Sequence, residues 1–305
     1  MYPYAVFGNP VLHSKSPQLF GPLLEAGKEH YARIRAQSAE DLVRIVRLLD
    51  IKGASITSPF KETILPLLDN ITLEARHVRA ANCLRQRNGL IEGHNSDHYG
   101  VCRALEESGL SLKGSRILVL GAGGAARAAV YGLVRAGAKL SISNRTLSRA
   151  KELASVFGAG VIPWTHSRPL PRFDAVVSAL LPEGIPPYID TLRYDILLDA
   201  LYKPSAMSTH TRERGIPLIG GERWLIHQGV EAAAFYMGKK ALPEILASGL
   251  HQRLQKKTLS IFVLKDDNIP GFHQQTHDLV ISAFGLEEDA INDQIHEEKD
   301  LAFGG

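Results

Sequence analysis

The sequence predicts an α/β protein with two domains, an N-terminal α/β domain followed by a doubly wound parallel sheet. Two observations predict this class: short apolar runs alternate with helical patterns along most of the chain, and one of these runs ends in a glycine-rich turn. With 305 residues and 45% hydrophobic content, the chain is long enough to bury a core in each domain.

The first hundred residues alternate between strand and helix patterns. We expect strands over residues 4–7, 53–56, 81–87 and 90–93, and helices over residues 16–26, 39–49 and 60–68. Ser16 is the expected N-cap of the first helix, with Pro17 in its first turn. Asn88 and Gly89 are expected to form a tight hairpin turn. Residues 1–99 thus make up the predicted first domain.

From residue 100 the alternation becomes regular. We expect helices over residues 100–108, 125–136 and 148–157, and strands over residues 116–120, 140–143, 175–178 and 196–200. This order is typical of a doubly wound sheet, which we assign to residues 100–221. Two further helices, over residues 222–237 and 243–255, are expected to pack back against the first domain, so that residues from about 222 to 256 complete it.

The glycine-rich turn has the pattern of a dinucleotide site. Gly121, Gly123, Gly124, Ala125 and Ala126 fit G-x-G-x-x-G/A after a buried strand and at the start of a helix, as in a Rossmann domain. Glycine allows the tight turn and lets backbone N–H groups approach a pyrophosphate, and alanine allows close packing of helix on strand. A tight turn without a ligand is the alternative interpretation.

The end of the next strand favours NADP over NAD. An NAD site usually has a carboxylate here, whereas this chain has Asn144, Arg145 and Thr146, with Arg149 one turn later. Two arginines and a hydroxyl can bind the extra 2′-phosphate. The simpler alternative is that Thr146 caps the next helix and both arginines are solvated.

Lys61 and Asp97 are the candidate catalytic residues. Each comes shortly after an apolar, strand-like run, and the ends of buried strands are where functional sites form. A solvated charge for Lys61 and a helix cap for Asp97 are the alternatives.

Composition excludes several other classes. No apolar run reaches about 18 residues, Cys83 and Cys102 show neither disulfide nor zinc spacing, and the twelve histidines form no metal motif. We therefore expect a cytoplasmic protein without a metal. The net charge of +3 combines a body of +10 with an acidic segment of −7 over residues 257–305. The arginines are spread singly, which favours a small anionic ligand over nucleic acid.

Several separated motifs together resemble the shikimate dehydrogenase family, over roughly residues 4–250. They are Gly8-Asn-Pro-Val-Leu-His-Ser-Lys-Ser-Pro17, Ile56-Thr-Ser-Pro-Phe-Lys61, Ala81-Asn82, Gly93-His-Asn-Ser-Asp97, the glycine-rich turn, Asn144-Arg-Thr146, Asp199-Ala-Leu-Tyr202 and Gln228. The resemblance implies reversible hydride transfer between NADPH and 3-dehydroshikimate, which gives shikimate, a precursor of the aromatic amino acids. It implies Lys61 and Asp97 as the catalytic pair, with Lys61 as the proton donor. It also implies a substrate-binding set: Ser14 and Ser16 for the carboxylate, Thr57, Asn82, Asp97 and Gln228 for the ring hydroxyls, and Tyr202 lining the pocket.

The chain also departs from the family pattern. Ser55-Ile-Thr57 replaces Asn-Val-Thr, Cys83 and Ser96 replace threonines, and Trp224 and Gly229 stand where methionine and alanine are common. The alternatives are therefore a related enzyme acting on quinate or another hydroxy acid, or a non-catalytic dinucleotide-sensing module. The sequence leaves a homodimer open. It also leaves open the role of residues 257–305, where we expect a strand over residues 259–264 and a helix over residues 277–284.

Overall fold

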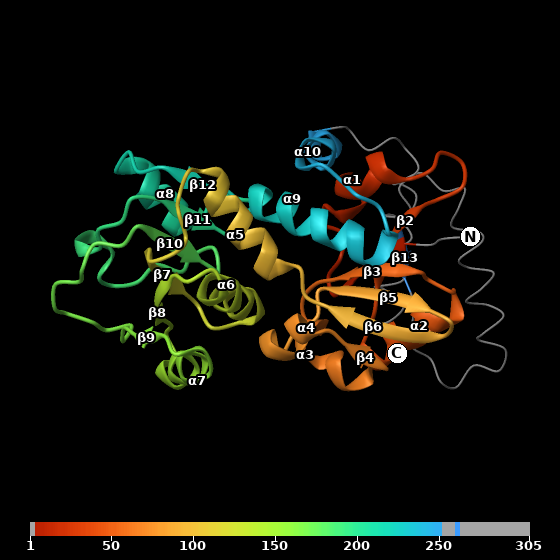
Figure 1. Cartoon of the computed structure of the whole chain (residues 1–305), viewed down its shortest axis with the longest axis horizontal. Coiled ribbons are helices and arrows are strands. Elements are labelled where there is room, and N and C mark those ends of the chain that lie inside the picture. Colours follow the sequence, from red (N-terminus) through yellow and green to blue (C-terminus); the bar gives the residue numbers. More distant parts are fainter. Residues whose placement is uncertain (1–3, 252–259, 263–305) are drawn as a thin grey trace, which may run out of the picture. The chain divides into compact units, whose positions relative to one another are not determined.

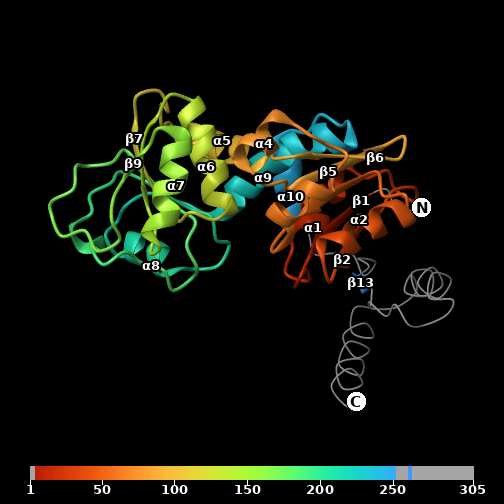
Figure 2. The ribbon, with the colours of Figure 1, turned by 90° about the horizontal axis from the view of Figure 1, so that it is seen from below.

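The computed structural model describes residues 4–251 and 260–262, which fall into two compact units (Figures 1 and 2). The first unit takes the described residues up to Ile71, together with Ala81–Gly93 and the described residues from Ala233 onward. The second unit takes Thr72–Ala80 and His94–Ala232. Each unit has its own sheet with helices packed on it, so the predicted α/β class is confirmed.

The first unit is built on a mixed sheet with the strand order β13-β2-β1-β3-β5-β6-β4. Its strands are β1 (Tyr4–Gly8), β2 (Tyr31–Arg35), β3 (Gly53–Ile56), β4 (Asn70–Ile71), β5 (Cys83–Arg87), β6 (Leu90–His94) and β13 (Ser260–Phe262). Strands β13, β2, β1 and β3 are parallel, and β5 runs antiparallel to β3. Asn88 and Gly89 have φ of 51° and 76°, which confirms the predicted hairpin turn between β5 and β6.

Helices cover both faces of this sheet. They are α1 (Ser16–Phe20), η1 (Gly21–Leu23), α2 (Ala39–Leu48), α3 (Phe60–Thr63), η2 (Leu65–Leu67), the π-helical segment η4 (Ala233–Met237) and α10 (Pro243–His251). Phe7 and Ile56 pack with Leu42 of α2 in the main core. The opposite face carries an aromatic cluster that includes Phe20, Tyr31 and Tyr236. Helix α10 packs on α1, as predicted for the second of the two C-terminal helices.

The second unit is built on a parallel sheet with the strand order β12-β11-β10-β7-β8-β9. Its strands are β7 (Arg116–Leu120), β8 (Lys139–Ser143), β9 (Gly160–Val161), β10 (Ala175–Ser178), β11 (Leu197–Asp199) and β12 (Leu218–Ile219). Its helices are α4 (Leu73–Val78), α5 (Asp97–Glu107), α6 (Gly124–Arg135), α7 (Leu147–Phe157), η3 (Ile189–Thr191), α8 (Ala206–Glu213) and α9 (Gly221–Ala232). Ile117 and Val119 of β7 pack with α5, α6 and α7, whereas Leu118 and Leu120 pack with η3 and α8. Helices on both faces make this the predicted doubly wound sheet.

Several local expectations differ from the structure. The first predicted helix is shorter, because Pro22 ends the α-helical hydrogen bonding and a 3-10 turn follows. Its N-cap is Lys15, and Ser16 is its first residue. Strand β2 and helices α4 and α8 were not predicted. Strand β13 lies within the strand expected over residues 259–264, and the helix expected over residues 277–284 lies outside the described residues.

Helix α9 belongs to the second unit, although we expected it to complete the first domain. Gly100 of α5 allows a close approach: a Cβ atom there would lie 2.7 Å from the Trp224 carbonyl oxygen and 2.9 Å from Gln228 Cβ. The backbone of α5 at Gly100 thus lies directly against Trp224 and Gln228 of α9, and this close contact joins α9 to the second unit. The chain returns to the first unit at the π-helical segment that follows.

Candidate active site

The glycine-rich turn has the geometry that a pyrophosphate requires. Gly121 has φ of +114°, and a Cβ there would lie 2.9 Å from the Ala179 carbonyl oxygen, so only glycine fits. Gly123 is the N-cap of α6, and nothing lies within 4 Å of where its Cβ would be. Ala126 is fully buried against the sheet. The open backbone at Gly123 and the N-terminus of a twelve-residue helix fit a dinucleotide phosphate.

The segment after β8 also fits the predicted cofactor. Leu120 of β7 pairs with Ser143 of β8, so the glycine turn and residues 144–149 follow neighbouring parallel strands. Arg145, Thr146 and Arg149 are exposed. Thr146 occupies the N-cap position of α7 but makes no side-chain capping hydrogen bond. The helix cap that we considered as an alternative role for this hydroxyl is therefore not formed.

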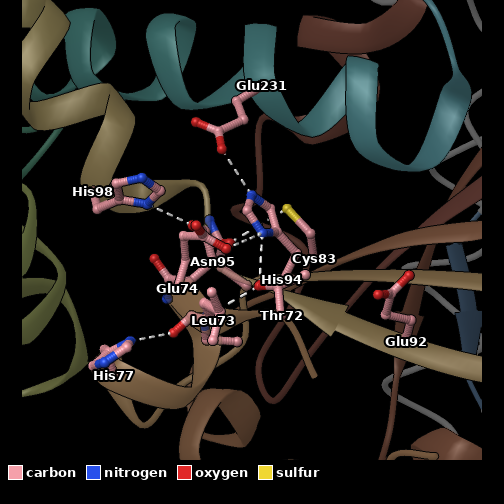
Figure 3. A network of polar contacts seen from close by, with 12 residues as sticks. Thr72, Leu73, Glu74, His77, Cys83, Glu92, His94, Asn95, His98 and Glu231 are labelled. Carbon is pink, nitrogen blue, oxygen red and sulfur yellow. Dashed lines mark hydrogen bonds and ion pairs between the residues drawn. The ribbon is translucent and has the colours of Figure 1, made fainter. Parts of the chain in front are cut away.

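A polar network holds the segment that carries Asp97 (Figure 3). At the end of β6, the buried His94 ring bonds Glu231 Oε1 through Nε2 at 2.9 Å and Thr72 Oγ1 through Nδ1 at 3.0 Å. Asn95 donates from Nδ2 to the Ala80 carbonyl oxygen at 3.0 Å and accepts from the Asp97 N–H at 3.2 Å. The segment is thus tied to α4 and α9 before α5 begins.

Asp97 is the first residue of α5 and is only 4% exposed. Its backbone carbonyl accepts a hydrogen bond of 2.9 Å from Trp224 Nε1. Because α5 and α9 approach closely at Gly100, this bond and Gln228 lie along the same helix–helix contact. The second unit therefore presents two of the predicted site residues from packed helices rather than from loops.

Tyr202 lies in the loop after β11. Desolvation of the Tyr202 phenol, and then the negative charges of Asp97 and Glu222, raise the pKa of this phenol. The residue as a whole is 44% exposed. The loop is anchored by Asp199, which accepts from Ser205 Oγ at 2.5 Å and from the Leu201 N–H at 3.2 Å. Burial raises the pKa of Asp199. Tyr202 thus interacts electrostatically with Asp97 within the second unit, and its role in lining a pocket stays a prediction.

In the first unit, Thr57, Lys61 and Asn82 lie on adjoining segments at one end of β3. The Asn82 carbonyl oxygen accepts from the Ile56 N–H at 2.8 Å, and the Lys61 carbonyl oxygen accepts from the Ala81 N–H at 2.7 Å. Lys61 is half-buried in α3. These backbone bonds hold the segments that carry the three residues next to one another.

Ser14 and Ser16 form a second group in this unit. Both are buried, Ser14 Oγ donates to Ser16 Oγ at 3.2 Å, and the Ser16 N–H donates to Ser14 Oγ at 3.3 Å. Once the Ser14 hydroxyl turns its proton away from Ser16, the two neighbouring hydroxyls can donate to the two oxygens of one carboxylate.

Comparisons with known proteins agree with these features. The model of the shikimate dehydrogenase substrate binding domain matches residues 6–84, and the model of shikimate / quinate 5-dehydrogenase matches residues 103–184. A shikimate dehydrogenase (NADP(+)) of Aquifex aeolicus is 33% identical over 245 residues, which are 77% of this chain and 91% of that protein. The chain belongs to the shikimate dehydrogenase family.

Solved structures show both the fold and the range of its relatives. Shikimate 5-dehydrogenase from Thermus thermophilus, crystallised with NADP(H) and shikimate, has a TM-score of 0.73 and 30% identity, covering 82% of this chain and 98% of that chain. A 5-ketofructose reductase of Gluconobacter has a TM-score of 0.71 and 26% identity, covering 82% of this chain and 97% of that chain. Relatives at similar distance thus bear the names of different enzymes.

The predicted residues of this family site are divided between the two units. Ser14, Ser16, Thr57, Lys61 and Asn82 lie in the first unit, and Asp97, Tyr202, Gln228 and the cofactor segments lie in the second. The pairing of Lys61 with Asp97 stays a prediction.

Sequence reasoning missed a hydroxyl cluster around Ser55. Tyr31 Oη lies 2.8 Å from Ser55 Oγ and 2.9 Å from Tyr236 Oη, and Ser55 Oγ lies 3.2 Å from Tyr236 Oη. Ser55 stands where the family pattern has asparagine, and that departure was the available signal. Tyr236 could not be foreseen, because it is 181 residues away.

Among residues 4–251 and 260–262, no group of three or more histidine, cysteine, aspartate and glutamate side chains could hold a metal ion. In the same part of the chain, no helix is long and apolar enough to cross a membrane.

Proposed function

We propose that this chain is an NADP-dependent shikimate dehydrogenase, an oxidoreductase that interconverts 3-dehydroshikimate and shikimate. The observation that carries the proposal is that one chain of this family has both the dinucleotide turn and every residue of the substrate-binding set that the resemblance implies. Relatives over most of its length are named for this activity, and one is solved with NADP(H) and shikimate.

Bound NADPH supplies the hydride, and side chains of the protein bind the substrate and supply the proton. As the substrate ketone accepts hydride, negative charge grows on its oxygen and a proton must arrive there. We assign that proton to the Lys61 ammonium, with Asp97 as its partner carboxylate, and such proton transfer contributes about 100- to 10,000-fold. Ser14 and Ser16 hold the substrate carboxylate.

The remaining polar groups orient the ring and select the cofactor. We assign the ring hydroxyls to Thr57, Asn82 and Gln228, because hydroxyl and amide groups can both donate and accept. Arg145, Thr146 and Arg149 form the proposed site for the 2′-phosphate of NADP, since all three are exposed after β8 and no carboxylate stands among them.

A different hydroxylated substrate is the second candidate. Ser55 has one hydroxyl where the family pattern has an amide, and that hydroxyl is already bonded to Tyr31 and Tyr236. Ser55 therefore offers a substrate fewer free donors than an asparagine would, so quinate or a related acid belongs in any substrate test.

The test is a rate comparison with purified protein, NADP+ or NAD+, and shikimate or quinate. The proposal predicts the fastest NADPH formation with shikimate and NADP+. A higher kcat/KM for quinate than for shikimate would identify quinate as the preferred substrate and contradict the proposal. NADP binding by calorimetry, with no turnover of either acid, would instead support the dinucleotide-sensing module.

We also propose a cytoplasmic location, because Cys83 and Cys102 are thiols and not a disulfide. Whether the chain forms a homodimer is a question for light scattering of the same preparation.

A further inference from the structure

A buried arginine bonds the backbone beside the two serines of the proposed substrate site. Arg33, on β2, is only 4% exposed. Its Nε and Nη2 donate to the Ser14 carbonyl oxygen at 3.0 and 2.9 Å, and Nη2 also donates to Gln18 Oε1 at 3.0 Å. The guanidinium thus bonds both the backbone of Ser14 and the side chain of Gln18, which belongs to the helix that begins at Ser16.

The strand register places this charge on the face of the sheet that carries site residues. Arg33 pairs with Val6 of β1, and Val6 pairs with Ser55 of β3, so these residues form one row across the sheet with their side chains on the same face. Tyr31, two residues before Arg33, bonds Ser55 on that face at 2.8 Å. Thr57, two residues beyond Ser55, follows the same alternation.

The arginine brings a positive charge to this loop as well as hydrogen-bond donors. A neutral amide could also donate to the Ser14 carbonyl, but it would carry no charge. A guanidinium keeps its positive charge at every physiological pH. Bonded to the Ser14 peptide, it places that charge one peptide from the serine hydroxyls, where a carboxylate gains more from it than a neutral group does.

We propose that Arg33 positions Ser14 and Ser16 and makes their pair selective for an anionic substrate. This inference rests on the proposed function, because it takes those serines as the carboxylate site. Arg33 acts through Ser14, so it is a positioning and specificity-determining residue.

The test compares shikimate with its neutral methyl ester in wild type and in Arg33→Gln. We expect kcat/KM for the acid to fall about 10- to 100-fold, the range for a hydrogen bond to a charged group, and that for the ester to fall less than about threefold. NADP affinity should not change. Arg47→Gln is the control, since it removes an exposed arginine of the same unit that bonds Asp69; it should leave the acid-to-ester ratio unchanged.

Equal losses for acid and ester in Arg33→Gln would overturn the inference and leave Arg33 as a structural pin. Arg33→Lys keeps the charge and loses the fork, so the acid preference should survive in it; loss of that preference would also overturn the inference. If Arg33→Gln does not fold, Arg33→Met, which also removes the charge, is measured in its place with the same two substrates. The proposed function is judged separately, by turnover of shikimate in the wild type; if another acid is turned over, its ester gives the same ratio.

Discussion

Replacing Gly100 by alanine would push apart the two helices that carry Asp97 and Gln228. The added Cβ would lie 2.7 Å from the Trp224 carbonyl oxygen, 2.8 Å from Trp224 Cδ1 and 2.9 Å from Gln228 Cβ. Restoring a separation of 3.4 Å from the carbonyl oxygen requires a shift of about 0.7 Å, and backbone on both sides prevents a side chain from simply turning away.

The expected cost in stability is the balance of three terms. Overpacking of this kind costs about 1–3 kcal/mol, and loss of the Trp224–Asp97 hydrogen bond costs about 1 kcal/mol. Alanine in a helix returns about 1 kcal/mol relative to glycine. We therefore expect the free energy of unfolding to fall by about 1–3 kcal/mol and the melting temperature by about 3–10 °C.

The effect on catalysis should be larger than the effect on cofactor binding. A misplacement approaching 1 Å can cost about 100-fold in rate, so we expect kcat/KM for shikimate to fall about 10- to 100-fold. NADP affinity should stay constant, because the glycine turn is untouched. Gly220→Ala is the matched control, as nothing lies within 4 Å of its Cβ and its φ is not positive. If Gly100→Ala melted within about 1 °C of wild type with unchanged kcat/KM, the close contact would carry no weight.

Three further predictions concern catalysis, cofactor choice and pH. Lys61→Ala should lower kcat about 100- to 10,000-fold with unchanged NADP affinity by calorimetry, and full activity would remove Lys61 as proton donor. Arg145→Ala should weaken NADP binding about 10- to 100-fold and hardly affect NAD, whereas parallel losses would refute the phosphate contact. Hydrogen bonds from Arg223 and then His227 lower the pKa of Glu107 to about 2, so their stabilisation is complete above its ordinary pKa of 4.5 and disappears as the pH falls toward 2. In thermal melts between pH 4.5 and pH 2, the melting temperature of Arg223→Gln should fall less than that of the wild type. An identical fall would contradict the link between the Glu107 pKa and stability.

The parts of the fold that local sequence determines were predictable. The glycine turn could be placed because Gly121 and the strand before it are adjacent in sequence, and the hairpin because Asn88 and Gly89 favour positive φ. Strand β2 was hidden because Arg33 and Arg35 interrupt its apolar character, although Arg33 is buried.

The remaining features depend on contacts between distant residues. The sequence around Trp224 does not indicate that this residue packs against Gly100. The unit to which α9 belongs therefore could not be predicted. The same holds for His94, whose ring is held by Glu231, 137 residues away. The candidate site residues came instead from separated motifs, which identify the residues without giving their arrangement.

The most direct test of the account is the steady-state rate of NADPH formation from shikimate and NADP+ by the purified chain, measured beside Asp97→Asn. The account predicts turnover by the wild type and a loss of about 100-fold or more in the variant, with NADP still bound. Absence of turnover in the wild type, or equal rates in the two proteins, would contradict it.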